Sequence, residues 1–144
     1  MATGDLRRPT RREHASLQAA VERAEAATGL QFGVFLGSVD DEHPREHADE
    51  MFRRAALHEQ PAVLIVVAPA QRRVEVVTSE QARRRISDIE ASEAVSRMTS
   101  SFRNGQLNAG VIAALDHLAA VAGHSTAGEG VNITDVVDED DELN

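Results

Sequence analysis

The sequence of 144 residues contains no cysteine, tryptophan, tyrosine or lysine. Without cysteine the chain can form neither disulfides nor thiolate metal sites, and it has no thiol nucleophile. Four phenylalanines are the only aromatic residues, too few for the stacking platforms that bind single-stranded nucleic acid. A formal net charge of −9 also opposes general nucleic-acid binding, so we expect no nucleic-acid partner.

Long apolar stretches are absent as well. The longest apolar run, residues 62–70, has the length of a strand and is far too short to span a bilayer. The first nine residues are polar and arginine-rich, without the apolar core of a secretory signal. We therefore expect a cytoplasmic protein without membrane insertion.

Charge is distributed unevenly along the chain. All fifteen basic residues are arginines, and four of them lie in the first twelve residues beside a single acidic residue. From Glu129 to the end there are seven acidic residues and no basic ones. We expect a flexible basic arm over 1–12, one α/β domain over 13–123 and an acidic, disordered tail over 124–144. The few aliphatic residues of the tail, within 131–137, could at most supply an edge strand.

Hydrophobic periodicity predicts alternating helices and strands. The predicted helices cover 13–28, 46–57, a short segment after Thr78, a segment opened by the capping box of Ser87 and Glu90, and a last helix capped by Asn108 that ends at Gly123. The predicted strands cover 30–36, 63–67 and 73–78. The first two strands flank a helix and should be parallel, and the third should form a hairpin with the second. The sequence therefore predicts an α/β fold with a small mixed sheet of three to four strands between helices.

Asp40 and Asp41, directly after the first predicted strand, are the best-placed acidic residues. Ligand sites in α/β sheets favour the carboxyl ends of strands, and calcium prefers several carboxylates. Asp88 could fold nearby and complete a site for calcium or another divalent cation. The spacing of a dedicated calcium loop is absent. The alternative is a solvated turn whose carboxylates favour the start of the next helix.

His43 and His47 are four residues apart, a spacing that can place two imidazoles on one helix face for zinc. However, His43 precedes Pro44 and should lie outside the helix, and no third ligand is evident.

Five arginines flank the third predicted strand: Arg72, Arg73, Arg83, Arg84 and Arg85. They could form a patch that binds a phosphorylated ligand or an acidic segment, including the acidic tail of this chain. One of them could instead pair with Asp88. The alternative for the whole group is a solvated face.

Residues 63–110 resemble the TPM domain family of thylakoid-lumen, photosystem-repair and receptor-modulator proteins. The resemblance lies in the apolar strand 63–67, in 71–78 and 83–88, and in Met98 with 101–110, and it extends over about 14–123. In detail the chain is similar to a cytoplasmic actinobacterial branch, a domain of unknown function.

This resemblance implies a small sheet between helices. For some members it also implies calcium in an acidic cleft and phosphatase activity, with Asp40 or Asp41 and Asp88 in the cleft. Many relatives have a signal peptide and a membrane anchor, and we expect neither in this chain. A glycine-rich turn after the third strand is replaced by Thr78-Ser79-Glu80.

Motifs for catalysis are missing: there is no G-x-S-x-G nucleophile elbow, no phosphate loop and no G-x-G-x-x-G. The sequence therefore favours a non-catalytic binding or accessory module that acts through protein contacts, without catalytic residues and without a required cofactor. The alternative is a divalent-cation-dependent, phosphatase-like enzyme that uses Asp40, Asp41 and Asp88 as metal ligands.

Overall fold

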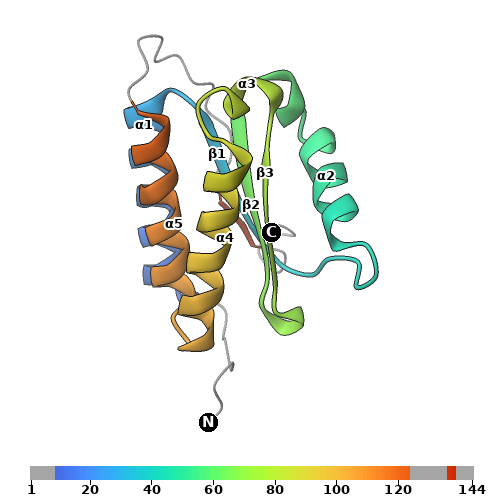
Figure 1. Ribbon diagram of the computed structural model, residues 1–144. Helices are drawn as coiled ribbons and strands as arrows, with labels where there is room; N and C mark the ends of the chain where they lie inside the picture. The colour runs from blue at the N-terminus through green and yellow to red at the C-terminus, as the bar shows by residue number, and fades with distance from the viewer. Residues whose placement is uncertain (1–8, 124–135, 139–144) are drawn as a thin grey trace.

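The computed structural model describes residues 9–123 and 136–138 (Figure 1). In chain order its elements are α1 (Arg11–Thr28), β1 (Gln31–Leu36), α2 (Pro44–Arg54), the 3-10 turn η1 (Leu57–Glu59), β2 (Ala62–Ala68), the 3-10 turn η2 (Pro69–Gln71), β3 (Arg73–Thr78), α3 (Glu80–Arg83), α4 (Asp88–Arg103), α5 (Leu107–Ala122) and β4 (Val136–Asp138). The predicted α/β fold with a small mixed sheet is confirmed.

The strands form one sheet in the order β3-β2-β1-β4. β1 and β2 are parallel and joined through α2, while β3 returns antiparallel to β2. β4 pairs parallel with β1, in the register Val34 to Val136. β4 falls within the predicted acidic tail over 124–144, where an edge strand was left open for residues 131–137, and the disorder of the tail stays a prediction. The remainder of 124–144 lies outside the described residues.

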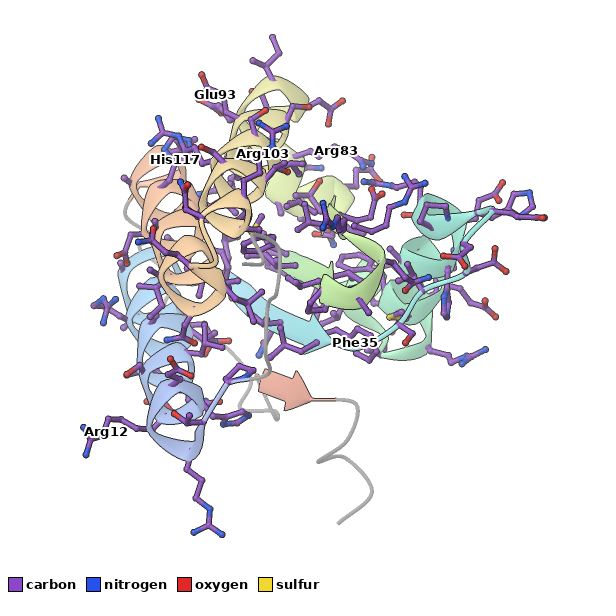
Figure 2. All side chains as sticks on the ribbon, turned by 90° about the horizontal axis from the view of Figure 1, so that it is seen from below. Arg12, Phe35, Arg83, Glu93, Arg103 and His117 are labelled. Atoms are coloured by element: carbon purple, nitrogen blue, oxygen red, sulfur yellow. The ribbon has the colours of Figure 1, made fainter. Side chains whose placement is uncertain are left out.

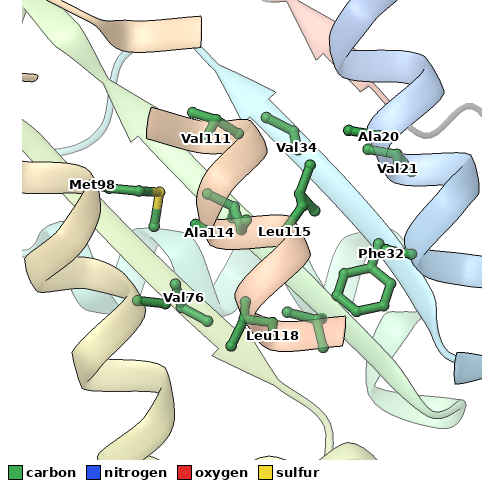
Figure 3. Close-up of a cluster of buried hydrophobic side chains, with 14 of the residues drawn as sticks. Ala20, Val21, Phe32, Val34, Val76, Met98, Val111, Ala114, Leu115 and Leu118 are labelled. Carbon is green, nitrogen blue, oxygen red and sulfur yellow. The ribbon is translucent and has the colours of Figure 1, made fainter. Parts of the chain in front are cut away.

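Helices cover the two faces of the sheet unequally. In Figure 1, α1, α4 and α5 lie on one side of the sheet and α2 lies on the other. On the three-helix side, Phe32 and Val34 of β1 are buried in the main core. Figure 3 shows Val111 and Leu115 of α5 in this core, between Met98 of α4 and Val34. All seven residues of β2 are buried, as expected of a central strand covered on both faces.

Capping boxes set where two helices begin. Thr10 and Glu13 form a capping box, so α1 begins at Arg11 and the predicted basic arm extends too far along the chain. The predicted box of Ser87 and Glu90 is present at α4. Asn108 does not cap the last helix as predicted, because α5 begins at Leu107 and Gln106 occupies the N-cap position without a side-chain hydrogen bond.

No helix in the described part of the chain is long and apolar enough to cross a membrane. The absence of membrane insertion and the cytoplasmic location stay predictions.

Candidate functional site

The sheet has two ends, and the residues predicted to carry function are divided between them. We call the end where β1 and β2 stop the carboxyl end, and the opposite end the amino end. Because β3 is antiparallel, Arg73 lies opposite Ala68 at the carboxyl end and Thr78 lies opposite Val63 at the amino end. The six residues of β3 separate the two ends by roughly 15–20 Å, at about 3.3 Å per residue.

This topology separates the three carboxylates of the predicted metal site. Asp40 and Asp41 follow β1 and lie at the carboxyl end, whereas Asp88 opens α4 beyond the amino end of the sheet. Within residues 9–123 and 136–138, no three histidine, aspartate or glutamate side chains are grouped so that they could hold a metal ion. The structure therefore does not bring the predicted calcium ligands together.

Asp40 organises the turn before α2. Its Oδ1 accepts hydrogen bonds from the backbone N–H groups of His43, at 2.8 Å, and Glu42, at 2.9 Å. These bonds favour the charged carboxylate and lower the pKa of Asp40 below its ordinary value, with smaller contributions from His43 and His47. The Asp40 carboxylate therefore accepts hydrogen bonds within the turn before α2. The alternative prediction for Asp40 and Asp41 was a solvated turn of this kind.

Asp41 and its neighbour Val39 tie the loop after β1 to the turn between β2 and β3. The Gln71 side chain of η2 donates to the Val39 carbonyl oxygen at 2.7 Å and accepts from the Val39 N–H at 2.8 Å. The same Gln71 amide nitrogen also donates to Asp41 Oδ1. Asp41 therefore helps to close the carboxyl end of the sheet.

The histidine pair lines an exposed acidic hollow of about 380 Å³ at the same end, together with Asp40, Glu46 and Glu50. His47 Nδ1 accepts a 2.9 Å hydrogen bond from the Asp40 N–H, which occupies the lone pair of that nitrogen. No third ligand is grouped with the two histidines in the part of the chain that the structure describes. His43 lies outside α2, at its N-cap position, and its side chain makes no capping hydrogen bond. This geometry does not support zinc binding by the pair.

Arg85 holds the ends of two helices at the amino end. Its Nη1 donates to the Thr28 carbonyl oxygen of α1 at 2.9 Å. Its Nη2 and Nε donate to the carbonyl oxygens of Gly123, at 2.7 Å, and Ala122, at 3.3 Å, where α5 ends. Neither α1 nor α5 has a basic residue of its own in the last turn, so Arg85 supplies a cation to two helix C-termini. Its donors are used inside the fold.

Arg83 and Arg84 are less engaged. Arg83 Nη1 donates to the Thr78 carbonyl oxygen at 3.3 Å. Arg84 is exposed and has no polar partner among residues 9–123 and 136–138. The expected ion pair between one of these arginines and Asp88 is not formed in that same part of the chain. The five arginines of the predicted patch are therefore two separate groups.

Arg72 and Arg73 instead join a residue that sequence analysis missed. With Arg103 from the last turn of α4 they line a hollow of about 300 Å³, whose other walls are Ala68, Pro69, Val74, Thr99 and Phe102. We call this site the arginine hollow. None of the three arginines forms an ion pair with any residue that the structure describes. It is a cationic site with an apolar floor.

Arg103 reaches the hollow because α4 starts at the amino end and runs back along the sheet. Its sixteen residues extend about 24 Å at 1.5 Å per residue, the height of the sheet or slightly more. Figure 2 views the molecule from the carboxyl end and labels Arg103 on α4 and Arg83 on α3. The length of α4 was predictable from the sequence. From that length one could have inferred that the last turn of α4 lies beside the turn between β2 and β3.

A larger hollow of about 480 Å³ lies between the starts of α1 and α5. It is lined by Pro9, Glu13, Ser16 and residues 105–109 with Ile112, and none of these residues is basic. Size alone does not identify a ligand, so the arginine hollow is the stronger candidate.

Solved structures of low sequence identity share this fold. The BA42 protein from the psychrophilic bacterium Bizionia argentinensis is 15% identical, with a TM-score of 0.78 over 92% of this chain and 96% of that protein. The N-terminal domain of a protein from P. gingivalis is 17% identical, with a TM-score of 0.69 and coverage of 82% and 77%. The N-terminal domain of cg2496 protein from Corynebacterium glutamicum is 16% identical, with a TM-score of 0.65 and coverage of 92% and 84%. At such identities the likeness shows the fold alone.

No curated protein matches the sequence. A family model does: Domain of unknown function (DUF5130) matches residues 6–119. The predicted membership of the TPM domain family is therefore wrong, because no TPM family is shown. The residues behind that resemblance form strands and helix caps, which specify elements of a fold and not a family. The calcium cleft and phosphatase activity that it implied lose this support, and the chain belongs to the family described as Domain of unknown function (DUF5130).

Proposed function

We propose that this domain is a non-catalytic binding module, and that it binds a carboxylate-rich segment of a partner protein in the arginine hollow. The observation that carries the proposal is that Arg72, Arg73 and Arg103, from a turn and a distant helix, line one hollow without ion-pair partners in the described part of the chain. A guanidinium group presents its donors in a planar fork that matches a carboxylate in a two-bond arrangement.

The walls of the hollow favour a peptide over a free inorganic anion. Val74 and Phe102 supply apolar surface between the arginines, where the stem of a glutamate could lie. Partial removal from water strengthens each charge-assisted bond relative to one on an open surface. A partner side chain with both a methylene stem and a carboxylate uses both features.

The alternative of a divalent-cation-dependent phosphatase receives less support from the geometry, because Asp88 lies at the other end of the sheet from Asp40 and Asp41. Amide shifts of residues 38–50 during calcium, magnesium and zinc titrations test it directly. A saturable shift in this segment at millimolar metal would revive that alternative.

A labelled heptapeptide, acetylated and amidated, with a central Glu-Asp pair and otherwise uncharged residues, tests the proposal. Fluorescence anisotropy should show saturable binding that weakens as salt is raised, because exposed charges are screened. Substituting Arg73→Gln or Arg103→Gln should weaken binding by roughly three- to tenfold each, which corresponds to about 0.7–1.4 kcal/mol.

Arg97→Gln is the matched control for Arg103→Gln. Arg97 is exposed on the same helix, loses the same charge and does not line the hollow. Equal effects of Arg97→Gln and Arg103→Gln would reduce the binding to net charge and contradict the proposal. A phosphorylated peptide serves as the second probe, and stronger binding of this peptide would assign the hollow to phosphate groups instead.

A further inference from the structure

β3 is an edge strand, and its free edge lies between two helices. Figure 1 shows β3 facing the viewer, with α4 on one side and α2 on the other. Edge strands present unpaired N–H and C=O groups that can pair with another chain, and proteins normally cover them. The residues that cover this edge therefore show which part of it is left open.

Two arginines cover the carbonyl groups in the middle and at the end of the edge. Arg45 Nη1, from α2, donates to the Val76 carbonyl oxygen at 2.9 Å. Arg83 Nη1, from α3, donates to the Thr78 carbonyl oxygen at 3.3 Å. In a strand, every second residue directs its backbone groups to the same side. Val74, two residues before Val76, must therefore also direct its N–H and C=O outward.

The register of the sheet gives independent evidence for this orientation. Val74 lies opposite Val67 of β2. The Val67 carbonyl oxygen accepts a 2.9 Å hydrogen bond from the Gly37 N–H, on the β1 side. Val67 therefore directs its backbone groups away from β3, and Val74 has no ladder partner. Val74 is also a wall of the arginine hollow.

We propose that the partner segment binds as a short antiparallel strand, with one residue directly opposite Val74. This inference rests on the proposed function and deepens it by giving the conformation and sequence pattern of the ligand. An antiparallel pair of this kind exchanges two N–H···O bonds through one residue on each strand. Val74 alone provides both groups beside the arginine hollow, and the bond from Arg45 to Val76 ends the pairing on one side.

The side chains next to Val74 set the sequence that fits. Directly opposite residues share a face of the sheet. The partner residue opposite Val74 would face Phe102 and Arg103 on the α4 side, which suits glutamate. The partner residue opposite Arg73 would face that cation on the α2 side and should be acidic. The partner residue opposite Glu75 should be uncharged, because like charges directly opposite each other destabilise a pair.

Read from its N-terminus, the antiparallel partner therefore has an uncharged residue, glutamate and an acidic residue in succession. The reversed order would place the acidic residue opposite Glu75, which already lies 3.5 Å from Arg45. We expect a peptide with Ser-Glu-Asp at its centre to bind more tightly than one with Asp-Glu-Ser. Composition and net charge are identical in the two peptides, so only the orientation differs.

The decisive experiment compares two N-methylated forms of the Ser-Glu-Asp heptapeptide on the full chain, by fluorescence anisotropy. Methylation of the glutamate nitrogen removes the donor to the Val74 carbonyl oxygen and should weaken binding about tenfold or more. Methylation of the adjacent aspartate nitrogen, which faces away from β3, is the matched control and should change binding less than about threefold. The Val74 amide should also exchange with solvent more slowly when the unmodified peptide is bound.

Three outcomes are distinguishable. Loss of binding only on methylation of the glutamate nitrogen supports strand addition. Equal binding of both methylated forms, with binding still sensitive to Arg73→Gln and Arg103→Gln, would overturn strand addition and leave the arginine hollow as a peptide site. No binding of the unmodified peptide, or binding unaffected by both arginine substitutions, would overturn the proposed function as well.

Discussion

At the amino end of the sheet Arg85 donates to three backbone carbonyl oxygens, whereas at the carboxyl end Arg72, Arg73 and Arg103 form no ion pair within the described part of the chain. The same residue type therefore has a structural role at one end and forms a candidate binding site at the other. The difference lies in what surrounds each guanidinium: two helix C-termini at the amino end, and apolar walls with open solvent at the carboxyl end.

The largest expected effect tests the structural side of this comparison. Replacing Arg85 by alanine leaves the carbonyl oxygens of Thr28, Ala122 and Gly123 without their donor and removes a cation from two helix C-termini. We expect the free energy of unfolding to fall by about 2–3 kcal/mol, measured by urea denaturation.

Arg84→Ala provides the control for that measurement. Arg84 is the preceding residue, is exposed and makes no polar contact in the described residues, so its loss should change the free energy of unfolding by less than about 0.5 kcal/mol. If the two variants are equally stable, Arg85 does not hold the helix ends together and the contrast between the two ends of the sheet fails.

A smaller loss of stability is expected from a substitution in the middle of the sheet, where Arg45 covers part of the free edge of β3. Arg45→Ala removes the donor to the Val76 carbonyl oxygen, and the free energy of unfolding should fall by about 1 kcal/mol. Arg53→Ala, an exposed position on the same helix, should have almost no effect. A loss after Arg45→Ala no larger than after Arg53→Ala would mean that water replaces this bond without cost.

The smallest expected effect is the pH dependence of stability that Asp40 causes at the carboxyl end of the sheet. The folded state lowers the pKa of Asp40 below its ordinary value, chiefly through hydrogen bonds from the His43 and Glu42 N–H groups. A depressed folded pKa stabilises the protein above the unfolded value, and this stabilisation is lost as the pH falls through the folded pKa. Asp40→Asn should therefore be less stable than the wild type near about pH 6, and this difference should shrink as the pH falls through the folded pKa of Asp40.

Urea unfolding of the wild type and Asp40→Asn across this pH range makes the comparison. A stability difference that stays constant with pH would show that the carboxylate charge is not what the two N–H groups stabilise.

The sequence alone predicts most of the helices and strands, but it does not predict which side chains meet at the candidate binding site. The apolar run in β2 predicts a strand covered on both faces, and the Ser87 and Glu90 box predicts the start of α4, because both signals are local. The capping box of Thr10 and Glu13 was equally readable, and it would have corrected the start of α1.

The predicted groups of functional side chains were wrong where they depended on which end of the sheet each residue lies at. Asp88 was grouped with Asp40 although the antiparallel return of β3 carries the chain away from the carboxyl end before α4 begins. The arginines at 72–73 and 83–85 were grouped for the same reason. Arg103 was overlooked because its place in the hollow depends on the direction in which α4 runs along the sheet, which no local pattern signals, although the length of the helix was predictable.

The central claim is that the cationic site at the carboxyl end binds acidic peptide. Its most direct test is a titration of the uniformly ¹⁵N-labelled protein with the Ser-Glu-Asp heptapeptide, followed by amide chemical shifts. We predict saturable shifts concentrated at Arg73, Val74 and Arg103, with those of Arg83 to Arg85 unchanged. Shifts of equal size at both groups of arginines, or no saturable shift at Val74 and Arg103, would contradict it.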